Sequence, residues 1–261
     1  MNRIVAFLYG LVSYAIFFGV FLYLLGFLAN ALVPKSIDSG VAGPWPLALA
    51  VNVGLILLFG LQHSVMARPT FKRWWTRFVP KPIERATYVM ATNLCLIALY
   101  VLWQPMPTII WEFTHPAARI AWWSLFGAGW MLVFVSTWLI HHFELFGLRQ
   151  VWNHLLRREE APVAFKTPLF YKVVRHPLYL GWMLAFWATP TMTVGHLLFA
   201  VSTTAYMLIA IRFEERNLID AHGEAYVEYR KRTPMLLPRP RRAPSPVASA
   251  PTASTPAGAV S

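Results

Sequence analysis

Residues 4–33 read IVAFLYGLVSYAIFFGVFLYLLGFLANALV and contain no charged side chain. A membrane-spanning helix needs about 20 mostly apolar residues to cross about 30 Å of hydrocarbon, so this run is long enough to span a bilayer. It is too long for the apolar core of a cleaved signal peptide, and we expect a retained helix that tilts or extends past the bilayer. The stretch indicates an integral membrane protein.

Further apolar runs follow at residues 47–67, 86–103, 120–140 and 194–211. A shorter run, residues 178–190, cannot cross alone and could re-enter the membrane from one side. Only the letters TMT separate this run from the last one, so the two form a tight helical hairpin. The sequence therefore predicts an all-α fold, a polytopic membrane helix bundle of five to six transmembrane helices.

The composition agrees with a membrane protein, because 57% of the 261 residues are hydrophobic and only 13% are charged. The net charge of +12 could suggest nucleic acid, but the basic residues lie in short segments between apolar runs. Such segments set topology and contact anionic lipid, so we expect membrane lipid and no nucleic acid as partners. The single cysteine, Cys95, excludes an intrachain disulfide and a multi-cysteine metal site.

The basic segments alternate along the chain. The loop after the second apolar run carries Arg68, Lys72, Arg73, Arg77, Lys81 and Arg85. Residues 147–176 and the region after residue 211 are also basic, whereas the intervening loops carry almost no positive charge. By the positive-inside rule, both termini and both basic loops are cytoplasmic.

The chain divides into a single membrane domain, residues 1–237, and a tail, residues 238–261, that is rich in Pro, Ala and Ser. The tail lacks the large apolar residues needed to bury a core, so we expect it to be disordered.

A first candidate site is the stretch VRHPLYLGW. Pro177 is typical of a first helical turn, so Arg175 and His176 stand just before a helix N-terminus, where free N–H groups favour an anion. Tyr179 can share their face, and Gly181 allows a close approach. The alternative is an arginine that extends to the membrane interface beside a structural histidine.

A second candidate site is the stretch IRFEERNL, directly after the last apolar run. The hairpin returns Glu214 and Glu215 to the level of Arg175 and His176. A carboxylate beside an arginine suits a zwitterionic amino-acid group. The alternative is the solvated start of a surface helix.

A third candidate site is WLIHHFELFGLRQVW. His141, His142 and Glu144 end the fourth long run at the same level, and His63 ends the second. The spacing of His142 and Glu144 is poor for two ligands on one helix, so we do not predict a metal. We expect at least one histidine to act in a substrate pocket or as a catalytic base.

The C-terminal part of the chain resembles the isoprenylcysteine carboxyl methyltransferase and phospholipid methyltransferase superfamily. The resemblance rests on the stretch RHPLYLGW, the helical hairpin, the letters EER and the stretch HGEAYVEYRKRTPMLLP. The resemblance implies a cytoplasmic pocket for S-adenosylmethionine, formed by about residues 165–237. The residues that it implicates are Arg175, His176, Tyr179, Gly181, Glu214, Glu215, Tyr226 and Tyr229.

Three further stretches are similar to the bacterial membrane-bound methanethiol S-methyltransferases and to related NnrU-type membrane proteins. They are FGLQHSVMARPTFKRWW, ERATYVMATNLCL and HHFELFGLRQVW. This similarity implies a bacterial inner-membrane enzyme that methylates a small volatile thiol, methanethiol, to dimethyl sulfide. No obligate protein partner is evident.

A thiol must lose its proton before it attacks the methyl group, so a base or a cationic environment is needed. We expect His142, oriented by Glu144, to take or relay that proton. The substrate pocket is expected to include His63, His141, Arg149 and Gln150.

Three alternatives remain open at this stage. The first is a methyltransferase whose substrate is a prenylcysteine carboxylate or a phospholipid amine. The second is an NADPH-dependent sterol reductase, because those enzymes share the His-Pro-x-Tyr pattern. The third is a haem-binding accessory protein with ligands among His63, His141 and His142.

Overall fold

The computed structural model describes residues 2–159 and 167–238. All but the first residue of the predicted disordered tail lies outside the described residues, as do residues 165 and 166 of the predicted cofactor-binding part.

Within these ranges, five helices are long and apolar enough to cross a membrane: α1 (Arg3–Ala29), α2 (Trp45–Ala67), α4 (Lys81–Leu102), α5 (Pro116–Leu139) and α9 (Val194–His222). The predicted polytopic membrane helix bundle is confirmed. Shorter elements join them: α3 (Pro69–Trp75), β1 (Ile109–Glu112), α6 (His142–Leu145), α7 (Leu148–Leu155), the 3₁₀ helix η1 (Leu169–Lys172), α8 (Pro177–Trp187), β2 (Thr191–Thr193) and α10 (Glu224–Arg232).

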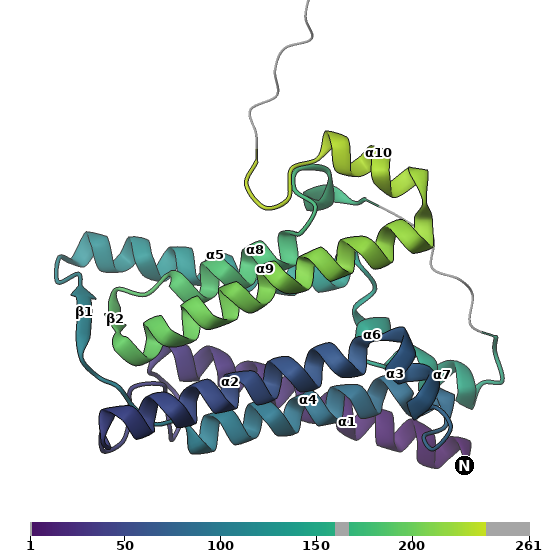
Figure 1. Ribbon diagram of the computed structural model, residues 1–261, viewed down its shortest axis with the longest axis horizontal. Coiled ribbons are helices and arrows are strands. Elements are labelled where there is room, and N and C mark those ends of the chain that lie inside the picture. Colours follow the sequence, from purple (N-terminus) through teal and green to yellow (C-terminus); the bar gives the residue numbers. More distant parts are fainter. Residues whose placement is uncertain (1, 160–166, 239–261) are drawn as a thin grey trace, which may run out of the picture.

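The helices form two layers, visible in Figure 1. One layer contains α1, α2 and α4, and the other contains α5, α8 and α9, with α2 and α9 in contact between them. The strands β1 and β2 pair antiparallel at one end of the bundle. At the other end lie the start of α1, the elements α3, α6 and α7, and the end of α9 (Figure 1). We call this the basic end, because the basic loops gather there.

The helix bounds differ from the apolar runs for local reasons. α1 stops at Ala29 because Asn30 adopts the left-handed conformation (φ 54°), which ends helices. α4 begins at Lys81, with Pro82 in its first turn, and so includes Arg85. α9 continues past residue 211 to His222 and thus carries Glu214 and Glu215 on regular helix.

The short apolar run forms α8, which has 11 residues. Such a helix is about 16 Å long and cannot cross the hydrocarbon alone. TMT forms the extended link β2, and α8 packs on α9 as the predicted hairpin.

Two glycines let α8 pack closely against α5. A Cβ on Gly129 would lie 2.6 Å from the backbone nitrogen of Ala185, and a Cβ on Gly181 would lie 2.8 Å from that of Val133. Since lipid removes the hydrophobic drive between helices, such small-residue contacts are how membrane helices associate.

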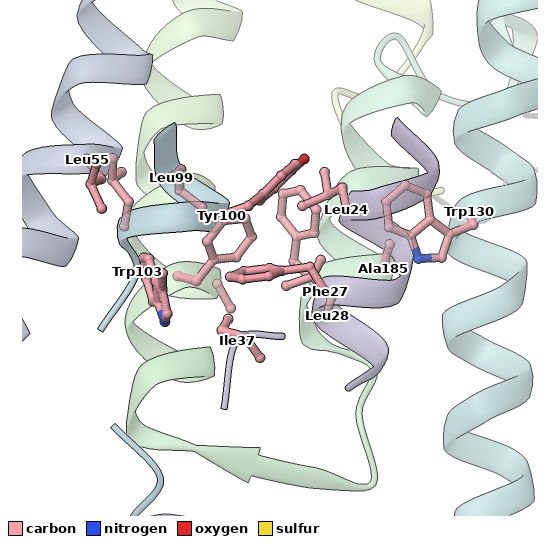
Figure 2. Close-up of a cluster of buried hydrophobic side chains, with 14 of the residues drawn as sticks. Leu24, Phe27, Leu28, Ile37, Leu55, Leu99, Tyr100, Trp103, Trp130 and Ala185 are labelled. Carbon is pink, nitrogen blue, oxygen red and sulfur yellow. The ribbon is translucent and has the colours of Figure 1, made fainter. Parts of the chain in front are cut away.

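A buried aromatic cluster holds the two layers together in the half of the bundle near the strands (Figure 2). The rings of Phe27 and Tyr100 lie at its middle, with centroids 5.2 Å apart, and Trp103 packs beside them. Leu24 and Leu99 belong to this cluster and also line the cavity described next, so the cluster closes one end of that cavity.

Candidate active site

A partly open cavity of about 310 Å³ lies between the two helical layers. Most of its wall is apolar and comes from every long helix of the bundle together with α6 and α8. Its titratable lining residues are His63, Arg85, Tyr88, His142, Tyr179 and Tyr206. We call this space the inner cavity.

A larger cavity of about 770 Å³ opens at the basic end, and we call it the outer cavity. It is lined by α3, α4, α6 and α7 and is rich in cations, among them Lys72, Lys81 and Arg158. Arg85 and Leu145 line both cavities and therefore stand between them.

His142 reaches the inner cavity through a sharp change of chain direction. The preceding His141 adopts the left-handed conformation (φ 73°) and is exposed, whereas His142 begins the single turn α6 and is only 6% exposed. The two adjacent histidines thus point to different environments, and of the two, His142 lines the cavity.

The hydrogen bonds of His142 define its tautomer. The Thr137 hydroxyl donates its one hydrogen to the Phe134 carbonyl at 2.7 Å, so Thr137 must accept from Nδ1–H of His142 at 2.9 Å. Nε2 is then the unprotonated nitrogen, and the Tyr14 hydroxyl donates to it at 2.7 Å. His142 is therefore an acceptor whose lone pair is reached through Tyr14.

Aromatic rings surround the imidazole. Trp138 stacks on it with centroids 4.8 Å apart and planes 9° apart, and Phe146 packs at 4.9 Å. Burial lowers the pKa of His142 below its ordinary value. The ring is therefore neutral near pH 7 and able to take up a proton.

Glu144, Arg149 and Gln150 form a separate group on α6 and α7. Arg149 pairs with the Glu144 carboxylate at 2.7 Å, and the Gln150 amide donates to the Glu144 carbonyl at 3.3 Å. Glu144 and Gln150 line the outer cavity. Among the described residues, the hydrogen bonds that orient His142 come from Tyr14 and Thr137.

His63 lies across the inner cavity, on α2. The Tyr88 hydroxyl lies 2.8 Å from its Nε2 and 2.9 Å from its Nδ1, and the Phe59 ring stacks on it. The Arg85 guanidinium covers the Tyr88 ring, with Cζ 5.1 Å from the centroid. His63 is thus part of the wall of the inner cavity.

The stretch before α8 forms a second polar group, centred on Glu215 of α9. Arg175 Nε pairs with Glu215 Oε1 at 2.7 Å, and His176 Nε2 lies 3.1 Å from the same oxygen. Arg175 Nη1 also donates to the Thr233 carbonyl at 2.6 Å and to the Arg230 carbonyl at 3.1 Å. These contacts tie the segment around α10 to the helical hairpin.

Tyr179 links this second group to the inner cavity. Its hydroxyl donates to Glu214 Oε2 at 2.7 Å, and Tyr179 itself lines the cavity. Gly181, on the same helix, meets the backbone of α5.

Two tyrosines of α10 complete the second group. Tyr226 is 1% exposed, and its ring lies 5.8 Å from that of Tyr229. The Tyr229 hydroxyl donates to the Tyr171 carbonyl at 2.6 Å. α10 is thus packed over the region before α8.

Some residues of the site carry no signal in the sequence pattern. Tyr14 and Thr137 look like ordinary members of apolar runs, and Arg85 looks like one more topology charge. Tyr14 and Thr137 contact His142, and Thr137 and Arg85 line the inner cavity, only because three different helices bring them there.

Comparison with known proteins gives several extensive similarities. The chain is 52% identical to Methanethiol S-methyltransferase 1 of Bradyrhizobium diazoefficiens, over 90% of this chain and 83% of that protein. It is 49% identical to Methanethiol S-methyltransferase of Mycobacterium tuberculosis, over 93% of this chain and 99% of that protein.

The chain belongs to the methanethiol S-methyltransferase family. The corresponding resemblance seen in the sequence is confirmed. A more distant similarity links this chain to Nurim of Bos taurus, at 33% identity over 65% of this chain and 68% of that protein. No protein-family model matches the chain, and no solved structure matches it.

Proposed function

We propose that this chain transfers a methyl group from S-adenosylmethionine to methanethiol and releases dimethyl sulfide. The observation that carries the proposal is the 52% identity to a methanethiol S-methyltransferase over 90% of the chain. The inner cavity supports it, because a small apolar thiol dissolves in lipid and fits an apolar cavity of about 310 Å³.

S-adenosylmethionine supplies an electrophilic methyl group on a positively charged sulfur, beside an ammonium and a carboxylate. The wall around Tyr179 suits such a molecule, because aromatic faces attract a cationic sulfur and the Glu214 carboxylate attracts an ammonium. We therefore assign cofactor binding to Tyr179 and Glu214.

We propose that the other residues predicted to bind the cofactor hold the elements around that site in place. Arg175, His176 and Glu215 hold the segment around α10 in place, and Gly181 seats α8 against α5. Tyr226 and Tyr229 lie in the covering helix α10. Of the eight residues predicted for the cofactor site, we thus assign two to cofactor binding and six to its support.

We assign proton removal from the thiol to Tyr14 and His142. The neutral His142 offers its Nε2 lone pair to the Tyr14 hydroxyl at 2.7 Å. A proton that reaches the Tyr14 oxygen can therefore be passed on as Tyr14 gives its own to His142. Trp138 and Phe146 exclude water from the imidazole, which keeps the transfer within the protein.

The remaining predicted residues fall on the outer cavity or its rim. Glu144 and Gln150 line it, Arg149 is held by Glu144, and His141 is exposed beside them. We propose that they shape the approach from the basic end rather than the reacting centre.

The basic end is proposed to face the cytoplasm, because short basic loops are retained there. The start of α1 and the end of α9 both lie at this end (Figure 1). Both termini would then be cytoplasmic, in a bacterial inner membrane, on the side where S-adenosylmethionine is made.

Headspace gas chromatography over the purified protein tests the proposal. With S-adenosylmethionine bearing a labelled methyl group, we expect labelled dimethyl sulfide only when methanethiol is also present. A prenylcysteine and phosphatidylethanolamine serve as competing acceptors. Labelled lipid product without dimethyl sulfide would replace the proposed substrate by a lipid.

A further inference from the structure

Arg85 occupies a distinctive position between the two cavities. It lies in the first turns of α4 and lines both the outer and the inner cavity. Its Nε donates to the Leu145 carbonyl at 2.7 Å, and its Cζ lies 5.1 Å from the centre of the Tyr88 ring. These two contacts hold the guanidinium at the wall of the inner cavity.

The contacts of Arg85 use only part of its hydrogen-bonding capacity. A guanidinium has five N–H donors, and the hydrogen bond to Leu145 uses the one on Nε. Among the described residues, neither terminal nitrogen donates a hydrogen bond to a protein group, and no carboxylate forms a salt bridge with Arg85. By contrast, Arg175 is held by a carboxylate and two carbonyls.

Arg85 also differs from the other residues of the inner cavity in its charge. Of the described residues that line this cavity, it has the one side chain with a permanent charge. The other titratable members are histidines and tyrosines, namely His63, Tyr88, His142, Tyr179 and Tyr206. An anion that forms in the cavity would find its counter-charge at Arg85.

We propose that the Arg85 guanidinium binds the thiol sulfur and stabilises it as the thiolate, which makes Arg85 a catalytic residue. This inference rests on the proposed function. The S–H bond breaks, its proton passes to the Tyr14–His142 pair, and its electron pair stays on sulfur. That pair forms the new S–C bond to the methyl carbon, while the electron pair of the old C–S bond leaves with the departing thioether.

The surroundings make this charge effective. A unit charge acts far more strongly on a neighbour in an apolar environment than in water, and the inner cavity is lined mainly by apolar side chains. A positive charge beside a thiol lowers the thiol pKa, so a weaker base suffices to ionise it. This matters here because burial makes His142 a weaker base than ordinary histidine.

The test compares two small thiols of different acidity in wild type and in Arg85→Gln. Methanethiol is a weak acid and needs the positive charge, whereas trifluoroethanethiol ionises much more readily. We expect Arg85→Gln to lower kcat/KM for methanethiol by about 100-fold, the loss typical of one charge-stabilising donor. The loss for trifluoroethanethiol should be below about tenfold by the same reasoning.

Two variants serve as controls. Arg77→Gln removes an exposed arginine of the same basic loop that lines neither cavity, and both rates should stay at the wild-type level. Arg85→Lys keeps the charge, so the ratio of the two rates should stay near wild type. If Arg85→Gln does not fold, Arg85→Met takes its place, and equal losses for the two thiols in that variant overturn the assignment.

Other outcomes contradict the inference in distinct ways. Equal losses for both thiols would make Arg85 a structural residue, and weakened S-adenosylmethionine binding by calorimetry would place its action on the cofactor. If the wild-type protein methylates neither thiol, the proposed function fails first, before any variant is compared.

Discussion

At the scale of single residues, Thr137 decides how His142 can act. Its hydroxyl hydrogen is committed to the Phe134 carbonyl, which leaves Nδ1 of His142 as donor and Nε2 as acceptor. The buried histidine is thereby held in the tautomer that can take a proton from Tyr14. His141, one residue earlier, has none of this environment because it is exposed.

The two histidines make a matched pair of variants. His142→Gln should lower the rate of dimethyl sulfide formation by about 100-fold or more, because a general base contributes that much. His141→Gln should leave the rate within about twofold, since exposed surface changes have small effects. Headspace gas chromatography gives the rates, and calorimetry should show unchanged cofactor affinity in both. Equal rates in the two variants would remove His142 from the mechanism.

The acidity of His142 predicts the pH profile of kcat. The ring must be neutral to accept a proton, and burial lowers its pKa from an ordinary value of about 6.5. The rate should therefore hold constant as pH falls to about 6.5 and decline only below it, as His142 becomes protonated. An acid limb centred above pH 7 would contradict a lowered pKa.

At the scale of elements, glycines let α5 and α8 pack closely against each other. Gly129 faces the backbone of Ala185, whereas Gly127, two residues earlier on α5, has open space around its missing Cβ. Gly129→Ala should lower the free energy of unfolding by about 1–3 kcal/mol, because the added methyl group overpacks this contact. Gly127→Ala should be neutral or stabilising by up to about 1 kcal/mol. Thermal unfolding in detergent measures both, and equal melting temperatures would contradict the close contact.

The attachment of α10 depends on the Arg175–Glu215 pair, whose side chains are 11% and 10% exposed. Arg175→Gln should lower the free energy of unfolding by about 3 kcal/mol, because it leaves the mostly buried Glu215 carboxylate without its arginine partner. Part of the loss is offset by Arg230, whose Nε lies 3.6 Å from Glu215. The variant should melt lower and be cleaved faster by trypsin at α10.

Lys231→Gln is the matched control for this pair. It breaks the Lys231–Glu228 pair on the same helix, whose side chains are 66% and 51% exposed. Exposed pairs contribute little, so its melting temperature should not change. If Arg175→Gln behaves like this control, the pair does not anchor α10.

At the scale of the whole molecule, the apolar runs predicted the bundle well. A run such as residues 4–33 has few alternatives to a helix in lipid, since every backbone polar group must be satisfied internally. The residues at which the helices end were less predictable. α9 extends past residue 211 because charged residues can continue a helix beyond the membrane, and no apolar pattern marks where it stops.

The candidate site was predicted only in part, for a related reason. His142, Arg175 and Glu215 stand out because charged or polar side chains are unusual beside apolar runs. Their partners do not stand out, because Tyr14 and Thr137 are common in membrane helices and their contacts depend on how α1 and α5 pack. Only the folded arrangement shows which polar groups share a cavity.

One measurement on proteoliposomes tests both the reaction and its side of the membrane. Methanethiol crosses lipid, whereas S-adenosylmethionine added outside stays outside. Trypsin cleavage at the exposed Lys231 and Arg232 of α10, in a parallel sample, gives the fraction of molecules whose basic end faces outward. We expect the dimethyl sulfide yield, read by headspace gas chromatography, to rise in proportion to that fraction. Dimethyl sulfide that is independent of orientation, or absent from every preparation, would contradict methyl transfer from the basic end.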